Sequence, residues 1–207
     1  VSHVFSSGSL PIIIGGDHSV PLGGLAALAQ QYPSFGILHL DAHGDLRNAY
    51  EGFQESHASI MFNALQIPQI SKLVQVGIRD ISHREMTLMQ RSNGRVVIYL
   101  DTQLKQATFS GHSWLQQCQD IVRNLPDQVY ISCDVDGLDP KLCPHTGTPV
   151  PGGLDLEEAY CLWREVVRSG RRIIGCDICE TGSHEWDGNV SARILYKLFS
   201  LMTLSAG

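Results

Sequence analysis

The chain has 207 residues and a formal net charge of −6, and 43% of its residues are hydrophobic while 17% are charged. This length and apolar content predict one soluble globular domain over residues 1–207 and exclude a disordered chain. The acidic balance and the scattered basic residues argue against a nucleic-acid partner, and no apolar stretch is long enough to span a membrane.

The six cysteines favour a reducing compartment. Several of them fall inside apolar strand or helix patterns, so buried free thiols are expected instead of a disulfide framework. Cys176 and Cys179 form a Cys-x-x-Cys pair, but they lie in a predicted strand and no second pair follows, which argues against a zinc knuckle. Residues 1–9 lack the charged start and apolar core of a signal peptide, so we expect a cytoplasmic protein.

Short apolar runs and amphipathic stretches alternate along the chain. The apolar runs predict strands at 10–14, 35–40, 72–77, 95–100, 128–133 and 172–178. Apolar positions at helical spacing predict helices at 20–29, 56–65, 83–90, 113–124, 155–169 and 190–204. Ser19 and Ser56 are placed to cap two of these helices, and Asp155 with Glu158 forms a capping box.

This alternation predicts an α/β fold with three layers, α/β/α, in which helices cover both faces of a mainly parallel sheet. In such sheets, ligands bind beyond the carboxyl ends of the strands. The loop at 141–153 is rich in Pro, Gly and Thr, and its length suggests that it lies over a site. Residues that directly follow the strands are therefore the first candidates for function.

Carboxylate and imidazole groups gather directly after three of the predicted strands. They are His18, Asp41, His43, Asp45, Asp134 and Asp136. Buried carboxylates that lie close together need a cation, and mixed carboxylate and histidine sets favour Mn, Fe, Co, Ni or Zn over calcium. Six ligands are sufficient for two ions, and two ions that share a water lower its pKa, so the chemistry indicated is hydrolysis.

Each motif also has a simpler interpretation. An isolated Asp-x-His-x-Asp, as at 41–45, is usually a solvated loop, and Asp-x-Asp before a turn often caps that turn. His18 could be a structural histidine, His39 lies inside a strand pattern and is expected in the core, and Glu180 alone would be a loop or helix acid. The metal interpretation therefore depends on the motifs occurring together.

In combination, these motifs resemble the ordered signature of the ureohydrolases, the arginase and agmatinase family. The segments concerned are Gly15-Gly16-Asp17-His18-Ser19, Asp41-Ala42-His43-Gly44-Asp45, Ser132-Cys133-Asp134-Val135-Asp136-Gly137-Leu138-Asp139-Pro140 and Thr146-Gly147-Thr148-Pro149. The resemblance covers nearly the whole chain. It implies a parallel α/β sheet with a dimanganese centre that hydrolyses a guanidinium group to urea and an amine.

The resemblance further implies a role for each candidate residue. One metal would be held by His18, Asp41, Asp45 and Asp134, and the other by Asp41, His43, Asp134 and Asp136. Asp41 and Asp134 would then bridge the two ions.

Three further residues complete the implied site. His57 matches the histidine that passes a proton to the departing amine, and Glu180 matches the carboxylate that grips the guanidinium by paired hydrogen bonds. Thr148 is expected to line the same pocket, and Asp136 is expected to accept the proton of the attacking hydroxide.

Two departures from the arginase pattern guide the choice of substrate. Arginases carry a Thr-Ser-Gly-Asn type loop that grips the amino-acid carboxylate where this chain has residues 50–56, and Ser82 stands in place of the Asp that serves the α-amino group. Agmatine, which would be cleaved to putrescine and urea, is therefore the expected substrate. Arginase, guanidinobutyrase and formiminoglutamase activities are alternatives, as is a catalytically silent relative that binds metal or ligand.

Other departures from the family pattern concern the segment after Glu180 and the beginning of the chain. The turn after Glu180 usually contains proline in the family, whereas residues 181–187 here do not, so the pocket is expected to be reshaped there. Family members usually carry a longer amino-terminal segment, which this chain is expected to lack. The resemblance also implies a small guanidino substrate as the partner and a homo-oligomer, either a trimer or a hexamer.

Overall fold

Parallel strands form one six-stranded sheet at the centre of the computed structural model, which describes residues 1–206. In order across the sheet they are β1 (Ile12–Ile14), β6 (Arg172–Cys179), β5 (Gln128–Asp134), β2 (Phe35–Leu40), β3 (Ile70–Ile78) and β4 (Val96–Leu100). Each neighbouring pair in this sheet is parallel, as the alternation of strands and helices predicts. The carboxyl ends of all six strands therefore lie at one edge.

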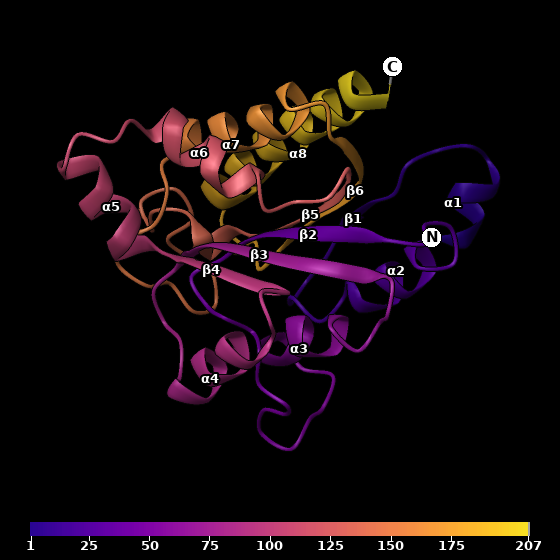
Figure 1. Ribbon diagram of the computed structural model, residues 1–207, viewed down its shortest axis with the longest axis horizontal. Coiled ribbons are helices and arrows are strands. Elements are labelled where there is room, and N and C mark those ends of the chain that lie inside the picture. Colours follow the sequence, from indigo (N-terminus) through magenta and orange to yellow (C-terminus); the bar gives the residue numbers. More distant parts are fainter. Residues whose placement is uncertain (207) are drawn as a thin grey trace.

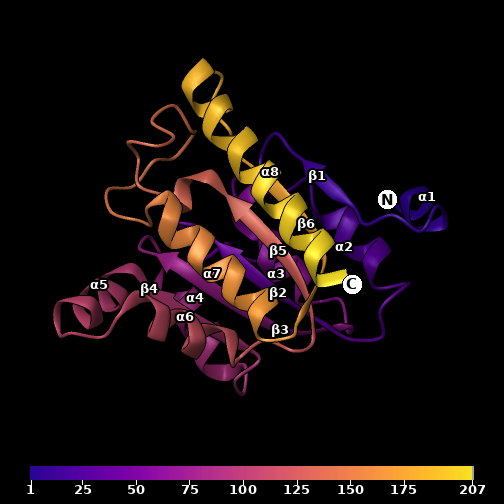
Figure 2. The same cartoon turned by 90° about the horizontal axis from the view of Figure 1, so that it is seen from above.

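Helices cover both faces of the sheet, which confirms the predicted α/β architecture (Figure 1). One face carries α6 (Trp114–Val122), α7 (Leu156–Arg168) and α8 (Glu185–Ala206), and the other carries α2 (Leu22–Leu28), α3 (Ile60–Ala64) and α4 (His83–Arg91). Figure 2 shows α7 and α8 side by side over β5 and β6. Within residues 1–206, no helix combines the length and the apolar character that crossing a membrane requires.

Four further helical elements complete the described part of the chain. They are α1 (Ser2–Ser6), α5 (Asp101–Phe109) and the two single-turn 3-10 helices η1 (His57–Ser59) and η2 (Val135–Gly137). The last of these, η2, directly continues β5 beyond its carboxyl end.

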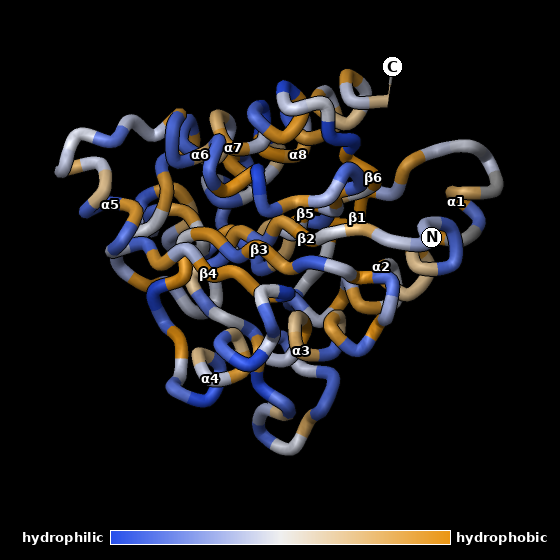
Figure 3. The backbone as a smooth tube through the Cα atoms, viewed as in Figure 1, coloured by the Kyte–Doolittle hydropathy of each residue, from blue (hydrophilic) through white to orange (hydrophobic). Residues whose placement is uncertain are grey.

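Each face of the sheet has its own hydrophobic cluster. Trp163 of α7 and Leu198 of α8 are fully buried above the sheet, and Leu25 of α2 and Met61 of α3 are fully buried below it. β2 is buried at all of its positions, because both faces of a central parallel strand are covered by helices. Figure 3 shows the resulting concentration of hydrophobic residues along the strands.

Two helices differ from the prediction. α5 was not predicted: it follows β4 directly, and only Asp101 and Leu104 of its residues are buried, so the sequence carries little apolar periodicity there. α8 begins at Glu185 instead of residue 190, so the second half of the segment 181–187 is helical.

The predicted cap at Ser19 is wrong. The Ser19 hydroxyl donates to Asp17 Oδ1 at 2.6 Å, and α2 begins after Pro21 without a side-chain cap. Ser56 does cap, but it caps η1, which divides the predicted helix at 56–65 into a 3-10 turn and the short helix α3. The predicted capping box at Asp155 is present at the start of α7.

A close backbone contact joins the ends of β5 and β2. A Cβ atom on Gly137, the last residue of η2, would lie 2.6 Å from the backbone nitrogen of Asp41 and 2.9 Å from its Cα. Only glycine permits this approach. The contact brings together the two acidic segments that follow β2 and β5.

Replacing Gly137 with alanine should therefore lower the free energy of unfolding by about 1–3 kcal/mol, because an added methyl group forces a packed interior apart. Gly23→Ala in α2 is the matched control, since nothing lies within 4 Å of the Cβ position there and alanine favours a helix. Urea unfolding followed by circular dichroism measures both variants. Equal stability of Gly137→Ala and the wild type would contradict the close contact.

Candidate metal centre

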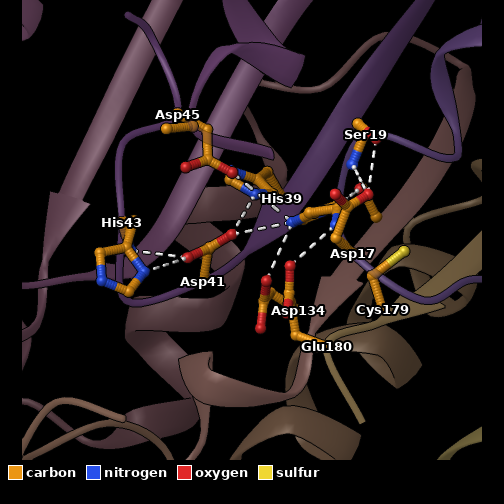
Figure 4. Close-up of polar contacts among 12 residues, drawn as sticks. Asp17, Ser19, His39, Asp41, His43, Asp45, Asp134, Cys179 and Glu180 are labelled. Carbon is orange, nitrogen blue, oxygen red and sulfur yellow. Dashed lines mark hydrogen bonds and ion pairs between the residues drawn. The ribbon is translucent and has the colours of Figure 1, made fainter. Parts of the chain in front are cut away.

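The carboxyl ends of β1, β2 and β5 bring all six candidate ligands into one cluster. Figure 4 labels four of them, Asp41, His43, Asp45 and Asp134. The centre of the cluster is His18, which follows β1. Its Nδ1 atom lies 3.1 Å from Asp41 Oδ2, 3.1 Å from Asp134 Oδ2 and 3.6 Å from Asp45 Oδ2. One imidazole nitrogen thus faces three carboxylates that come from two different strands.

A second group forms around His43. Its Nδ1 atom lies 3.0 Å from Asp136 Oδ2 and 3.4 Å from Asp41 Oδ1. The N–H of Ala42 donates to Asp136 Oδ1 at 3.0 Å and so joins the two acidic turns, and the N–H of Asp136 donates to Asp134 Oδ1 at 2.9 Å within the second turn. Asp41 belongs to both groups, one oxygen facing His43 and the other facing His18.

The surroundings of the two histidines favour their protonated forms. Burial lowers the pKa of His18, but hydrogen bonds to Asp134, Asp177 and Asp41 outweigh burial and raise this pKa well above its usual value. Burial likewise lowers the pKa of His43, and its hydrogen bonds to Asp136 and Asp41 outweigh this effect and raise the pKa to about 11. Protonated imidazoles therefore balance part of the negative charge of the carboxylates.

The pKa values of the carboxylates are shifted as well. Burial raises the pKa values of Asp45 and Asp134, and the neighbouring charge of Asp41 raises them further. Burial alone would raise the pKa of Asp41 too, but the adjacent histidines hold it well below its usual value. Among the described residues, no Lys or Arg forms an ion pair with these groups. Buried oxygen and nitrogen donors without such counterions form a donor set that suits divalent cations.

A row of polar side chains crosses the sheet directly beneath the cluster. Gln75 of β3, His39 of β2, Ser132 of β5 and Asp177 of β6 are successive register partners, and each is 0% exposed. His39 was expected in the core and is buried there, but the sequence analysis missed that it contacts Asp41. A signal did exist, because residues two positions apart in a strand point to the same face, and His39 stands two positions before Asp41.

Two members of the row orient His18. The Nε2 atom of His18 lies 2.8 Å from Ser132 Oγ, and Ser132 Oγ donates to Asp177 Oδ1 at 3.1 Å. The Nε2–H group of His18 therefore points toward the sheet and donates to Ser132 Oγ. Nδ1 consequently faces the carboxylates, which is the orientation that a metal-binding histidine takes when its other nitrogen is hydrogen bonded.

A cavity of about 160 Å³ adjoins the cluster and contains the three further predicted residues, His57, Thr148 and Glu180. Glu180 has a φ of 61°, in the left-handed region that residues with a side chain rarely adopt. Its backbone N–H donates to the Gly16 carbonyl at 2.8 Å, and its Oε1 accepts from the backbone N–H of His18 at 2.9 Å. These bonds hold the carboxylate at the cavity wall, where burial raises its pKa.

The other two residues lie on the remaining walls. The Thr148 hydroxyl donates to Asp136 Oδ2 at 3.2 Å, and the ring of His57 packs edge to face on Tyr50 with ring centroids 5.5 Å apart. Further lining residues that the sequence analysis did not identify are Arg47, Tyr50, Asp80 and Glu85. No role was assigned to them from the sequence, although Tyr50 is the first residue of the segment 50–56 that stands in place of the arginase loop. Only the folded chain reveals their place in the cavity.

The segment 181–187 lies outside the cavity, so it does not line the pocket that it was expected to reshape. Asp187 is fully buried and accepts hydrogen bonds from the backbone N–H and from Nδ1 of His145, both at 2.9 Å. The Thr146 hydroxyl donates to the Glu180 carbonyl at 2.7 Å. The segment therefore anchors the loop at 141–153. It can influence the cavity only indirectly, by fixing the positions of that loop and of Glu180.

Known proteins resemble this chain along nearly its whole length. The sequence profile of the arginase family matches residues 1–202. The N(1)-aminopropylagmatine ureohydrolase of Thermus thermophilus is 32% identical over 97% of this chain and 65% of that protein, and the guanidinobutyrase of Pseudomonas aeruginosa is 30% identical over 96% of this chain and 62% of that protein. The structure of proclavaminate amidino hydrolase from Streptomyces clavuligerus matches with a TM-score of 0.80 and 26% identity, over 94% of this chain and 64% of that one. The chain thus spans slightly less than two thirds of the length of each relative.

Divalent metal binding to the cluster should release protons at pH 7. His43, whose pKa is raised to about 11, is protonated there, and the pKa of His18 is shifted in the same direction, whereas a metal ligand must be a neutral imidazole. His43 at least should therefore lose a proton, and the affinity should rise with pH through the neutral range. Titration with Mn²⁺ in weakly buffered solution measures the release. Binding without proton release would contradict the charged state described for His43.

Proposed function

The chain belongs to the arginase family, and on this premise we propose that it is a binuclear-metal amidinohydrolase that cleaves a guanidino substrate to urea and an amine. The observation that carries the proposal is the cluster of two histidines and four carboxylates beside a cavity that contains His57, Thr148 and Glu180. Curated relatives bear the names of hydrolases that act on such compounds.

The donor atoms support two ions. We assign His18, Asp41, Asp45 and Asp134 to one ion and Asp41, His43, Asp134 and Asp136 to the other. The ligand atoms of Asp41, His43 and Asp136 lie within 4.8 Å of one another, and Asp41 also joins the group around His18. Manganese is the metal that we propose for these mixed oxygen and nitrogen donors. When bound, a pair of ions in such a site lowers the pKa of a shared water and supplies the nucleophile at neutral pH.

Side chains of the cavity would direct the rest of the reaction. Glu180 would accept paired hydrogen bonds from the guanidinium group and hold its carbon over the cluster. Asp136, which is held by the backbone N–H of Ala42 and by Thr148, would accept the proton of the attacking water. His57 would pass a proton to the departing amine. In sum, one guanidinium ion and one water give one urea and one alkylammonium ion.

Charges around the cavity favour a substrate with a cationic tail. A second hollow of about 340 Å³ shares Tyr50 and His57 with the catalytic cavity, and Asp17, Glu51 and Glu55 also line it. An amine in that hollow would be attracted by three carboxylates, whereas a carboxylate tail would be repelled. A positive charge lies nearby on Arg47, whose guanidinium carbon is 5.1 Å from the centre of the Tyr50 ring.

An α-amino acid head is poorly served here. Ser82, which stands where arginases have an acidic residue, caps α4, and its hydroxyl donates to Glu85 Oε2 at 2.7 Å. We therefore propose agmatine, or a longer amine such as the aminopropylagmatine of the Thermus relative, as the substrate in preference to arginine or guanidinobutyrate.

Urea release in the presence of Mn²⁺ tests this proposal. Agmatine and N(1)-aminopropylagmatine should give values of kcat/KM at least about tenfold above those of arginine and guanidinobutyrate, a difference of about 1.4 kcal/mol. A preference for guanidinobutyrate would overturn the substrate assignment. Two bound ions without urea from any guanidino compound would instead identify a catalytically silent metal-binding relative, and release of formamide from formiminoglutamate would identify a formiminoglutamase.

A double variant tests whether the hollow binds the cationic tail of the substrate and not its guanidinium group. The double change Glu51→Gln and Glu55→Gln should raise KM for agmatine by about 3- to 10-fold and leave kcat unchanged, because the tail is bound equally in ground and transition states. Glu157→Gln on the exposed surface of α7 is the matched control. An unchanged KM in the double variant would remove the hollow from the substrate-binding site.

We further propose that the protein works in the cytoplasm as a homo-oligomer, a trimer or a hexamer. The six cysteines are all free and five of them are buried, which suits a reducing compartment. Light scattering at micromolar protein concentration measures the assembly, and a monomer there would contradict it.

A further inference from the structure

His39 connects the centre of the sheet to the candidate metal cluster. It is fully buried in β2, and its Nε2 atom lies 2.8 Å from Asp41 Oδ2. Its other ring nitrogen, Nδ1, lies 2.9 Å from Nε2 of Gln75, the register partner on β3. The same Gln75 nitrogen lies 2.7 Å from the carbonyl oxygen of Gly44, between the predicted ligands that follow β2.

The Gly44 carbonyl decides how these groups share their protons. A carbonyl oxygen can only accept, so the atom of the Gln75 amide that faces it must be the nitrogen. That nitrogen can only donate, so His39 Nδ1 must accept from it and carry no proton. The proton of a neutral His39 ring is therefore on Nε2, from which it is donated to Asp41 Oδ2. One backbone carbonyl thus fixes the orientation of an amide and the tautomer of a histidine.

This arrangement separates His39 from the residues that we assign as ligands. Both of its ring nitrogens are engaged, one by the sheet and one by a carboxylate, although its position would also allow it to be counted with His18, Asp41 and Asp45 as a possible metal group. A carboxylate oxygen has two lone pairs. Donation from His39 occupies one lone pair of Asp41 Oδ2 and leaves the other directed at the cluster.

We propose that His39 is a positioning residue of the metal centre: Gln75 and Gly44 lock it as the Nε2–H tautomer, and in this form it fixes the carboxylate of Asp41, the residue assigned as a bridge between the two ions. The inference rests on the proposed two-metal site. It predicts that loss of the His39 donor weakens both ions together, because a bridging carboxylate belongs to both.

Two substitutions at residue 39 test the role by metal binding alone. His39→Leu keeps the apolar bulk and removes the donor, so Mn²⁺ affinity at both sites should fall by about 10- to 100-fold, the usual effect of losing a group that orients a ligand. His39→Gln offers an amide N–H at about the reach of imidazole Nε2, and should retain two ions with affinities within a few-fold of the wild type. His112→Leu, at an exposed histidine, is the matched control. Calorimetric titration with Mn²⁺ gives the stoichiometry and affinity of each variant.

Two results would overturn the proposal. Wild-type Mn²⁺ binding by His39→Leu would reduce His39 to a core residue. Loss of one ion with retention of the other in His39→Gln would make His39 a ligand, since an amide replaces a donor to Asp41 far better than it replaces a metal-bound imidazole.

A spectroscopic measurement on the unaltered chain covers the case in which His39→Leu does not fold. Nitrogen-15 NMR of the histidine-labelled, metal-free protein at pH 7 should give a neutral His39 ring with its proton on Nε2. A proton on Nδ1 would contradict the lock. These readouts need no substrate, so a protein that binds two ions as described but releases no urea would refute the proposed function and leave this inference intact.

Discussion

Four carboxylates within 3.6 Å of two imidazoles, each of the four at most 6% exposed, are the constraint on which this structure depends. Little of their surface is exposed to water, and Lys or Arg side chains do not pair with them in the described part of the chain. The cluster therefore costs free energy unless protons or metal ions balance it. The parallel sheet makes the cluster possible, because the three strands that precede the ligands end at the same edge. Helices that pack on both faces of the sheet keep water from its sides.

The layer below the cluster explains how its geometry is kept. Ser132 and Asp177 direct one nitrogen of His18 toward the sheet, while Gln75 and His39 support Asp41 from beneath. These four side chains form one row of register partners, so the hydrogen bonding of the backbone sets their spacing. Side chains on strands are more precisely held than side chains on loops. The candidate ligands on the loops thus receive their orientation from the strands that precede them.

The candidate ligands could be predicted from the sequence because each motif is local and follows an apolar strand. The motif from Asp41 to Asp45 can be identified once the apolar run of β2 is seen to end just before it. Asp134 can be identified from β5 in the same way. The polar row could not be predicted, because the pairing of His39 with Gln75 depends on register between strands far apart in sequence. The acidic hollow near His57 is lined mostly by residues 50–57, and what could not be predicted is that Asp17, far away in sequence, joins that loop there. α5 was missed for another reason: a polar helix on the periphery carries no apolar period to detect.

The central proposal is that the cluster would hold two metal ions, with Asp41 and Asp134 assigned to both. X-ray diffraction from crystals grown with Mn²⁺, recorded at the manganese absorption edge, tests it most directly. The account predicts two anomalous peaks roughly 3.5–4 Å apart, the separation usual in two-metal sites, with one peak next to His18 and the other next to His43. A single peak, or two peaks that do not share both carboxylates, would contradict it.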